Sequence, residues 1–403
     1  MAQKKKTKSW IRPHHRLVWK YLFPFLALYC RLRYRIKVEP FREQGQRPYL
    51  VLMNHQTPFD QFFVCMAFKG PIYFLATEDI FSLGWVSHII RFLVAPIPIK
   101  KQTGDLQATM TCLRVAKEGG SIAMSPEGNR TYSGRTEYMN PSIAKLARKL
   151  GLPIALFRIE EGYGIQPRWA EKTRKGKMRA GVTRVIEPED YQNMTDEELF
   201  AAIHQELMVD EARVTGQFHH KTLAEYLERA IYVCPHCGLA HFRTEGDTIV
   251  CLDCGRTARY LPSKEIEGDF PFRFVAEWYD YQKDFINGLD LTPYLEEPLY
   301  QDTARLSEVI VYKKKQVLWE QAHIRLYGDR ILLENDQGGT MLFAFDETDA
   351  VTVLGRNKLN VYHGGKIYQF KGDKRFNALK YVHIFHRYKN LQKGDGNGKF
   401  LGL

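Results

Sequence analysis

Three groups of residues in the 403-residue chain combine types and spacings that could do chemistry. His55 and Asp60 lie in the segment NHQTPFD, the segment SPEGNRT spans 125–131, and four cysteines form two Cys-x-x-Cys pairs between 234 and 254. A neutral histidine can take a proton from an alcohol at neutral pH, while a carboxylate bonded to its other ring nitrogen fixes the tautomer and stabilises the imidazolium. The first segment therefore indicates general-base chemistry, with His55 as the base and Asp60 as its orienting partner.

A purely structural interpretation of the same two residues stays open. The chain has 13 histidines, so a carboxylate five positions after one of them is a weak signal. Thr57 and Asp60 also stand three apart before an apolar run, so that Thr57 could be the N-cap of a helix and Asp60 could complete its capping box. His55 would then be an ordinary histidine at the end of a strand.

The segment SPEGNRT could bind an anion. Gly128 and Asn129 favour a turn that directs backbone N–H groups and the Arg130 side chain to one place. The arginine guanidinium stays charged and donates two parallel hydrogen bonds, which suits a phosphate group. The alternative for this segment alone is an ordinary turn with a surface arginine.

The elements around these motifs predict an α/β fold. Strands that alternate with helices build a layered sheet, and ligands of such sheets lie beyond the carboxyl ends of the strands, where both motifs fall. The expected strands are 31–39, 49–53, 97–99, 121–124 and 152–156, and the expected helices are 62–68, 105–118 and 141–150.

Four segments follow one another in the first half of the chain: NHQTPFD (54–60), PIPIKK (96–101), SPEGNRT (125–131) and GLPIAL (151–156). Together they resemble the lysophosphatidate acyltransferase family, which carries N-H-x-x-x-x-D, a strand ending in a basic residue, F-P-E-G-T-R and a V-P-I-V-P-like strand. The resemblance covers roughly residues 15–190. It implies His55 as base, Asp60 as its partner, Glu127, Gly128 and Arg130 as the acceptor-binding loop, and Lys100 or Lys101 as the phosphate-contacting basic residue.

By this resemblance the expected reaction is transfer of a fatty acyl group from acyl-CoA or acyl-carrier protein to the free hydroxyl of lysophosphatidate, which makes phosphatidate. Ser125, Asn129 and the lysine at 100 or 101 depart from the family pattern, and a lysine lacks the guanidinium fork. Glycerol 3-phosphate, another lysolipid or an aminolipid therefore remain alternative acceptors. The sequence does not choose between the two acyl donors.

The N-terminus predicts contact with a membrane surface. Residues 1–44 hold twelve basic and two acidic residues, so nearly all of the net charge of +12 lies there. The run from Leu17 to Cys30 is apolar but too short, and too interrupted by Lys20 and Pro24, to cross a bilayer. We expect a peripheral or monotopic protein on the cytoplasmic face of the membrane, because this pattern fits an interfacial helix better than a nucleic-acid groove. The alternative is a helix packed on the protein with a solvated basic tail.

The four cysteines predict a structural zinc site. Two Cys-x-x-Cys-Gly knuckles separated by 13 residues supply four thiolates, which is a closed tetrahedral set without an open catalytic position. A redox dithiol would not need the second pair. The four ligands are Cys234, Cys237, Cys251 and Cys254.

The chain as a whole is long enough for two or three folded units. We expect a mixed α/β acyltransferase-type sheet flanked by helices, then a zinc ribbon, then a small antiparallel β domain with a C-terminal helix, similar in element order to a pleckstrin-homology domain. A non-catalytic zinc-ribbon membrane adaptor is the rival function. The expected units are 1–44 (basic interfacial segment and first strand), 45–190 (acyltransferase core), 191–229 (helical linker), 230–262 (zinc ribbon) and 263–403 (helix and β domain).

Overall fold

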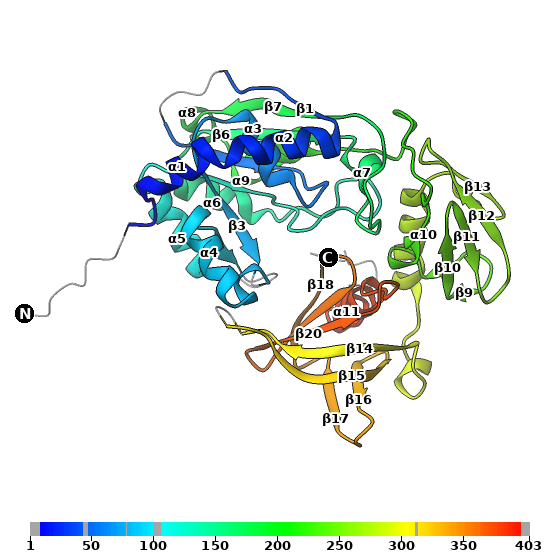
Figure 1. Cartoon of the computed structure of the whole chain (residues 1–403). Helices are drawn as coiled ribbons and strands as arrows, with labels where there is room; N and C mark the ends of the chain where they lie inside the picture. Colours follow the sequence, from blue (N-terminus) through cyan, green and yellow to red (C-terminus); the bar gives the residue numbers. More distant parts are fainter. Residues whose placement is uncertain (1–8, 43–46, 78, 100–105, 311–312, 396–403) are drawn as a thin grey trace, which may run out of the picture.

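The computed structural model describes residues 9–42, 47–77, 79–99, 106–310 and 313–395. An N-terminal α/β unit, a small antiparallel ribbon and a curled antiparallel β unit follow one another along the chain (Figure 1). This confirms the expected α/β sheet and the C-terminal antiparallel β unit that a helix closes. The unit boundaries drawn from the sequence remain predictions.

The first unit is built on a seven-stranded mixed sheet. Its strand order is β1-β7-β6-β2-β5-β3-β4, and every neighbouring pair is parallel except β6 and β7. Apolar and β-branched residues dominate the central strands because both faces of this sheet are covered. The strands are β1 (Ile36–Val38), β2 (Leu50–Met53), β3 (Ile72–Thr77), β4 (Ile97–Ile99), β5 (Ser121–Met124), β6 (Ile154–Glu160) and β7 (Met178–Ile186).

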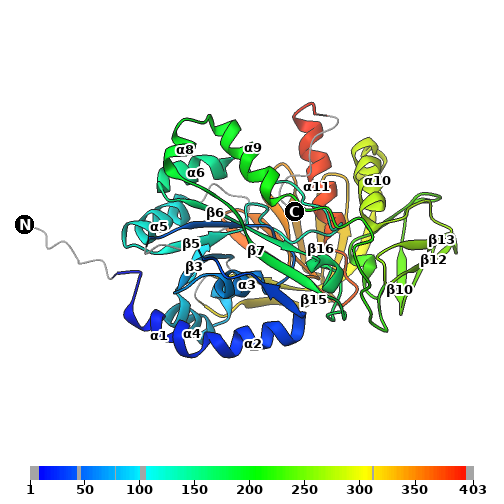
Figure 2. The same ribbon diagram turned by 90° about the horizontal axis from the view of Figure 1, so that it is seen from above.

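Alternate residues of the central strand β2 enter two separate cores. Leu50 and Leu52 pack with α5, α6 and α9, whereas Val51 and Met53 pack on the other face with α2 and α3. Figure 2 shows α2 and α3 on one side of the sheet and α6 and α9 on the other. The helices of this unit are α1 (Pro13–Tyr21), α2 (Phe23–Tyr34), α3 (Asp60–Ala67), η1 (Ile80–Ser82), α4 (Trp85–Val94), α5 (Leu106–Lys117), α6 (Ser142–Leu150), α7 (Gly162–Ile165), α8 (Pro188–Gln192) and α9 (Asp196–Leu207).

The strand predicted over 31–39 is wrong in its first half. Helix α2 continues through Tyr34 and ends at Arg35, whose φ of 48° is left-handed, so that β1 begins only at Ile36. The basic and apolar residues alternate here as in a strand, but they belong to a helix. Cys30 and Tyr34, one helical turn apart, are both fully buried on the same face of that helix. Leu32, on the opposite side of this helix, is 73% exposed.

The helices near the N-terminus leave many apolar side chains on the surface. Helix α1 lies beside α4, since the ring of His14 stacks on that of Phe92 at 4.2 Å between centroids. Within the described residues, no helix has both the length and the apolar composition that crossing a bilayer requires.

The ribbon follows the first unit after a long connection that contains η2 (Leu227–Arg229). A two-stranded hairpin precedes a four-stranded antiparallel sheet of order β10-β11-β12-β13. Its strands are β8 (Val233–Cys234), β9 (Gly238–Leu239), β10 (Phe242–Glu245), β11 (Thr248–Cys251), β12 (Thr257–Tyr260) and β13 (Ile266–Gly268).

The C-terminal unit is a seven-stranded antiparallel sheet of order β17-β16-β15-β14-β20-β19-β18. Its core is continuous with that of the ribbon, and Tyr132 and Trp169 of the first unit are buried in the same cluster. The elements are α10 (Val275–Gly288), η3 (Pro293–Leu295), β14 (Tyr300–Glu308), β15 (Gln316–Leu326), β16 (Arg330–Glu334), β17 (Thr340–Ala344), β18 (Thr348–Leu354), β19 (Lys358–His363), β20 (Lys366–Gly372) and α11 (Leu379–Gln392).

A cluster of charged groups also joins the first and last units. The carboxylate of Asp79, just after β3, receives hydrogen bonds from Lys315 and from Lys358, the latter at 3.1 Å. Burial opposes the charge on Asp79, but the two lysines outweigh it and lower the pKa of this carboxyl group. The start of β19 is thereby fixed to the edge of the α/β unit.

Candidate active site

The candidate base lies at the carboxyl end of the central strand. Asn54, which follows β2, donates from Nδ2 to the Ile159 carbonyl at 2.8 Å and accepts from the Ile159 N–H at 2.7 Å. Both groups are buried, so Asn54 ties the end of β2 to β6 and sets where His55 leaves the sheet. This role of Asn54 does not follow from the sequence pattern.

The structure brings His55 and Asp60 together. The His55 Nδ1 atom lies 2.8 Å from Asp60 Oδ2, and the carboxylate is fully buried while the imidazole is 26% exposed. An acceptor at Nδ1 holds the ring proton there, so the neutral tautomer carries its lone pair on Nε2. This is the tautomer that a general base acting through Nε2 requires.

The same carboxylate organises the turn that leads into α3. It accepts from the Gln56 N–H at 2.6 Å, from the Thr57 N–H at 2.9 Å and from the Thr57 hydroxyl at 2.7 Å. The predicted N-cap at Thr57 is wrong, because the helix begins at Asp60 itself and the Thr57 hydroxyl donates to the carboxylate instead. The same Asp60 carboxylate therefore stabilises the turn before α3 and orients the His55 ring.

Glu127 connects the second motif to the first. Its Oε1 accepts the His55 backbone N–H at 2.9 Å, and its side chain is buried. Burial raises the pKa of Glu127 to about 8, although the hydrogen bond from His55 favours the charged form. Gly128, with φ of 69°, forms the turn that turns the chain toward Arg130. Glu127 thus contacts the candidate base, through the backbone N–H of His55.

Arg130 points its charge into the protein interior. Its side chain is 91% buried, and Nη1 has no hydrogen-bond partner within the described parts of the chain. Burial, together with the neighbouring guanidinium groups of Arg168 and Arg356, lowers the pKa of Arg130 to about 9. A buried cation with an unused donor is a suitable place for an anionic ligand. Lys100 and Lys101, the other predicted phosphate contacts, lie outside the described residues.

The four predicted metal ligands converge. All four sulfur atoms lie within 4.8 Å of one another, with Cys234 to Cys254 at 3.8 Å and Cys237 to Cys251 at 3.6 Å. Thiolates at about 2.3 Å from a tetrahedral zinc ion are about 3.8 Å apart, so the spacing fits that ion. His236 and His241 are not part of this cluster.

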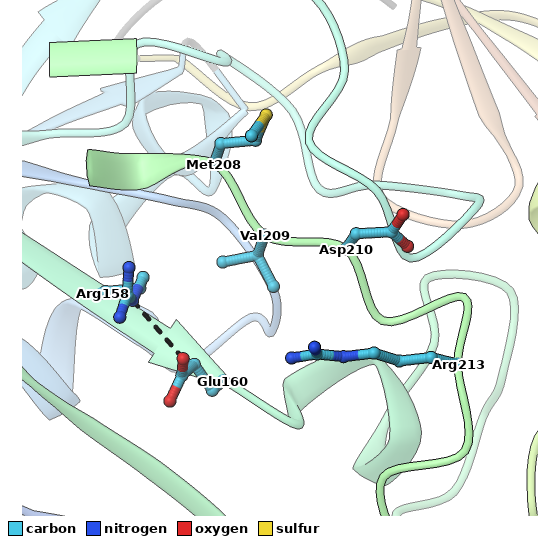
Figure 3. A pocket seen from close by; sticks show the side chains of 6 residues that line it. All are labelled: Arg158, Glu160, Met208, Val209, Asp210 and Arg213. Atoms are coloured by element: carbon cyan, nitrogen blue, oxygen red, sulfur yellow. Dashed lines mark ion pairs between the residues drawn. The ribbon is translucent and has the colours of Figure 1, made fainter. Parts of the chain in front are cut away.

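A polar hollow of about 280 Å³ opens elsewhere on the first unit, between β6 and the segment after α9 (Figure 3). Arg158 and Glu160 form an ion pair across part of it at 3.4 Å. No predicted site residue lines it. Its lining residues are Arg158, Glu160, Met208, Val209, Asp210 and Arg213.

Comparison with known proteins identifies the unit that holds these motifs. Residues 34–159 match the family model described as Acyltransferase. This segment of the chain is similar to acyltransferase domains. Over 113 residues it is 26% identical to the 1-acyl-sn-glycerol-3-phosphate acyltransferase of Borreliella burgdorferi, a match that covers 27% of this chain and 45% of that protein. The chain thus spans less than half the length of this relative.

Among solved structures, the chain is similar to the 1-acyl-sn-glycerophosphate (LPA) acyltransferase PlsC from Thermotoga maritima. The two share 19% sequence identity at a TM-score of 0.41, and the match covers 48% of this chain and 80% of that one. The segment that matches the family model holds His55, Asp60, Glu127 and Arg130, whereas the ribbon and the C-terminal unit lie outside the family match.

Proposed function

We propose that the chain transfers a fatty acyl group from acyl-CoA or acyl-carrier protein to the free hydroxyl of lysophosphatidate, which makes phosphatidate. The observation that carries this proposal is the contact between His55 Nδ1 and the buried Asp60 carboxylate, within a domain that matches the Acyltransferase family. Arg130, buried and cationic on the neighbouring loop, supports an acceptor that bears a phosphate.

In this mechanism the acceptor's hydroxyl is the nucleophile. As its oxygen bonds to the thioester carbonyl carbon, its proton passes to His55 Nε2, and the Asp60 carboxylate stabilises the resulting imidazolium. The tetrahedral intermediate then collapses, the carbon–sulfur bond breaks, and the imidazolium returns the proton to the leaving thiolate. The products are the ester and the free thiol, and no covalent enzyme intermediate is needed.

Glu127 contributes by holding the base in place. Its hydrogen bond to the His55 N–H fixes the backbone that carries the imidazole, and the carboxyl group keeps its proton at neutral pH because of its raised pKa. Glu127 therefore holds His55 without adding a second full negative charge beside Asp60. Asn129, where the family pattern has threonine, binds the Arg168 guanidinium through Oδ1 at 3.2 Å.

We also propose that the chain lies on the cytoplasmic face of a membrane, and the exposed apolar side chains of its first unit support binding to a lipid surface. Phe25, Leu32 and Trp85 are each 73% exposed, and Lys20, Arg31 and other exposed basic residues flank them. Burying such side chains at an anionic lipid interface is favourable, whereas water solvates them poorly. We call this set the apolar helix surface: Leu17, Tyr21, Leu22, Phe25, Leu28 and Leu32 of the α1–α2 segment, and Trp85, Ile89, Phe92 and Val94 of α4.

The four-cysteine cluster supports one structural zinc ion, which would cross-link the hairpin β8–β9 to the end of β11. The ion would supply folding energy to a ribbon whose own core is small, and no step of acyl transfer depends on it.

His55→Ala should lower kcat by at least about 100-fold, because the proton of the attacking hydroxyl then has no base. The measurement is transfer from labelled acyl-CoA or acyl-carrier protein to lysophosphatidate, with glycerol 3-phosphate and other lysolipids as alternative acceptors. His323→Ala, a change to an exposed histidine on β15, is the control and should leave the rate unchanged. Full activity in the His55 variant, with wild-type thermal stability, would reject the mechanism.

Arg130→Gln should raise the KM for lysophosphatidate by roughly 10- to 100-fold, as expected for the loss of a charged hydrogen bond of about 1.5–3 kcal/mol. The KM for the acyl donor should change much less. Arg184→Gln, an exposed change on β7, serves as the matched control. An unchanged acceptor KM in the Arg130 variant contradicts a phosphate-binding role.

Replacing three side chains of the apolar helix surface, Phe25→Glu, Leu32→Glu and Trp85→Glu together, should reduce binding to phosphatidylglycerol-containing vesicles at least tenfold. Each burial is worth about 1.5–3 kcal/mol at full immersion. Flotation of the protein with the vesicles measures the effect. Leu342→Glu, at an exposed leucine of β17, is the control. If the triple variant floats as well as the wild type, this surface does not face the lipid.

Elemental analysis of the purified chain should find about one zinc per molecule, and Cys237→Ser should lose it and melt at a lower temperature. Cys65→Ser lies outside the cluster and should keep the metal. A metal-free wild-type protein that melts no lower after chelation would refute the zinc site.

A further inference from the structure

The turn between β18 and β19 of the C-terminal unit contacts the SPEGNRT loop of the acyltransferase domain. Arg168, which is fully buried, makes the connection. It donates from Nη1 to the Arg130 carbonyl at 2.9 Å, from Nε to the Gly355 carbonyl at 3.2 Å and from Nη2 to the Val353 carbonyl at 3.2 Å. The guanidinium also stacks on the Tyr132 ring at 4.3 Å. One side chain therefore fixes the position of the turn relative to Arg130.

The turn is also held at its other end. Lys358, the first residue of β19, pairs with Asp79 of the acyltransferase domain at 3.1 Å. The short segment between Leu354 and Lys358 is thus anchored on both sides. Its central residue, Arg356, follows Gly355, whose carbonyl binds the same guanidinium group as the Arg130 carbonyl. Electrostatic interaction between Arg356 and Arg130 agrees with this position.

The arginines here outnumber the acids that neutralise them. Arg356 Nη1 pairs with Glu171 at 3.1 Å, but Glu171 also pairs with the buried Arg229 at 2.8 Å. Arg356 Nε and Arg130 Nη1 are both buried without a hydrogen-bond partner in the described structure. Two unused buried donors on neighbouring cations call for an anionic acceptor, because leaving them unbonded is costly.

We propose that Arg356, from the C-terminal unit, binds the phosphate of the acceptor together with Arg130, and that Arg168 positions both. This inference rests on the proposed acyl transfer and adds a binding residue from outside the acyltransferase domain. The ligand is a phosphate monoester, whose oxygens can accept from both guanidinium groups. The phosphates of coenzyme A share this chemistry, so the experiment must separate acceptor from donor.

Arg356→Gln should raise the KM for lysophosphatidate about tenfold and leave the KM for acyl-CoA within twofold. Arg356→Lys should recover part of the affinity, because it restores charge without the guanidinium fork. The increase in the KM for lysophosphatidate that Arg356→Gln causes should also become smaller below about pH 6, where a phosphate monoester loses its second negative charge. A role confined to the ion pair with Glu171 would also be rescued by lysine, but it would not give this pH dependence, so the pH profile separates the two roles. Arg305→Gln, at an exposed ion pair of β14, is the matched control and should leave both constants unchanged.

An unchanged acceptor KM in Arg356→Gln, or a larger effect on the KM for acyl-CoA, would overturn the inference while leaving acyl transfer intact. Absence of transfer by the wild type to every acceptor would instead reject the proposed function. In that case calorimetric titration with glycerol 3-phosphate decides the inference by itself. Wild-type binding that weakens in Arg356→Gln but not in Arg305→Gln supports it, and equal binding by all three proteins refutes it.

Discussion

The carboxylate of Asp60 accepts hydrogen bonds from four donors that lie within three consecutive residues, and the geometry of the site follows from this. The donors are the His55 ring, the N–H groups of Gln56 and Thr57, and the Thr57 hydroxyl. A buried carboxylate needs such donors to offset its desolvation, and here they come from the loop that carries the base. The hydrogen bonds that form the turn before α3 and the one that orients the imidazole therefore depend on the same carboxylate. Any change that frees Asp60 would unfold the turn and misplace the base together.

The sequence predicted contacts between residues that lie close together in the chain. His55 and Asp60 are five residues apart and the turn between them is short, so their meeting followed from the residue types. The four cysteines likewise lie in two knuckles whose spacing constrains them. Local alternation was misleading at 31–34, where the same residues serve a helix that buries Cys30 and Tyr34 on one side. Periodicity over four residues is too short to separate a strand from a helix that continues from before it.

The contacts of Arg168 could not have been predicted in this way. Its partners lie 38 residues before it, at Arg130, and 185–187 residues after it, at Val353 and Gly355. Nothing in their spacing or composition marks them, because the pairing depends on how the C-terminal unit docks. A core shared across the units, which includes Tyr132 and Trp169, fixes that docking. The buried position of Arg168 is a result of tertiary packing, and only a structure shows it.

This packing gives the C-terminal unit a part in the electrostatics of the site. Burial and the neighbouring guanidinium groups disfavour the charged form of Arg130, and the core shared between the units helps to hold the residues around it in place. Donors placed in advance around an acceptor group need no reorganisation when it binds, so the affinity gained is larger than flexible surface cations could give. If the turn at 355–357 moved away, Arg168, which also binds the Arg130 carbonyl, would lose its hydrogen bond to the Gly355 carbonyl. The segment that matches the Acyltransferase family and the C-terminal β unit are therefore joined by a common core and by the contacts of the buried Arg168.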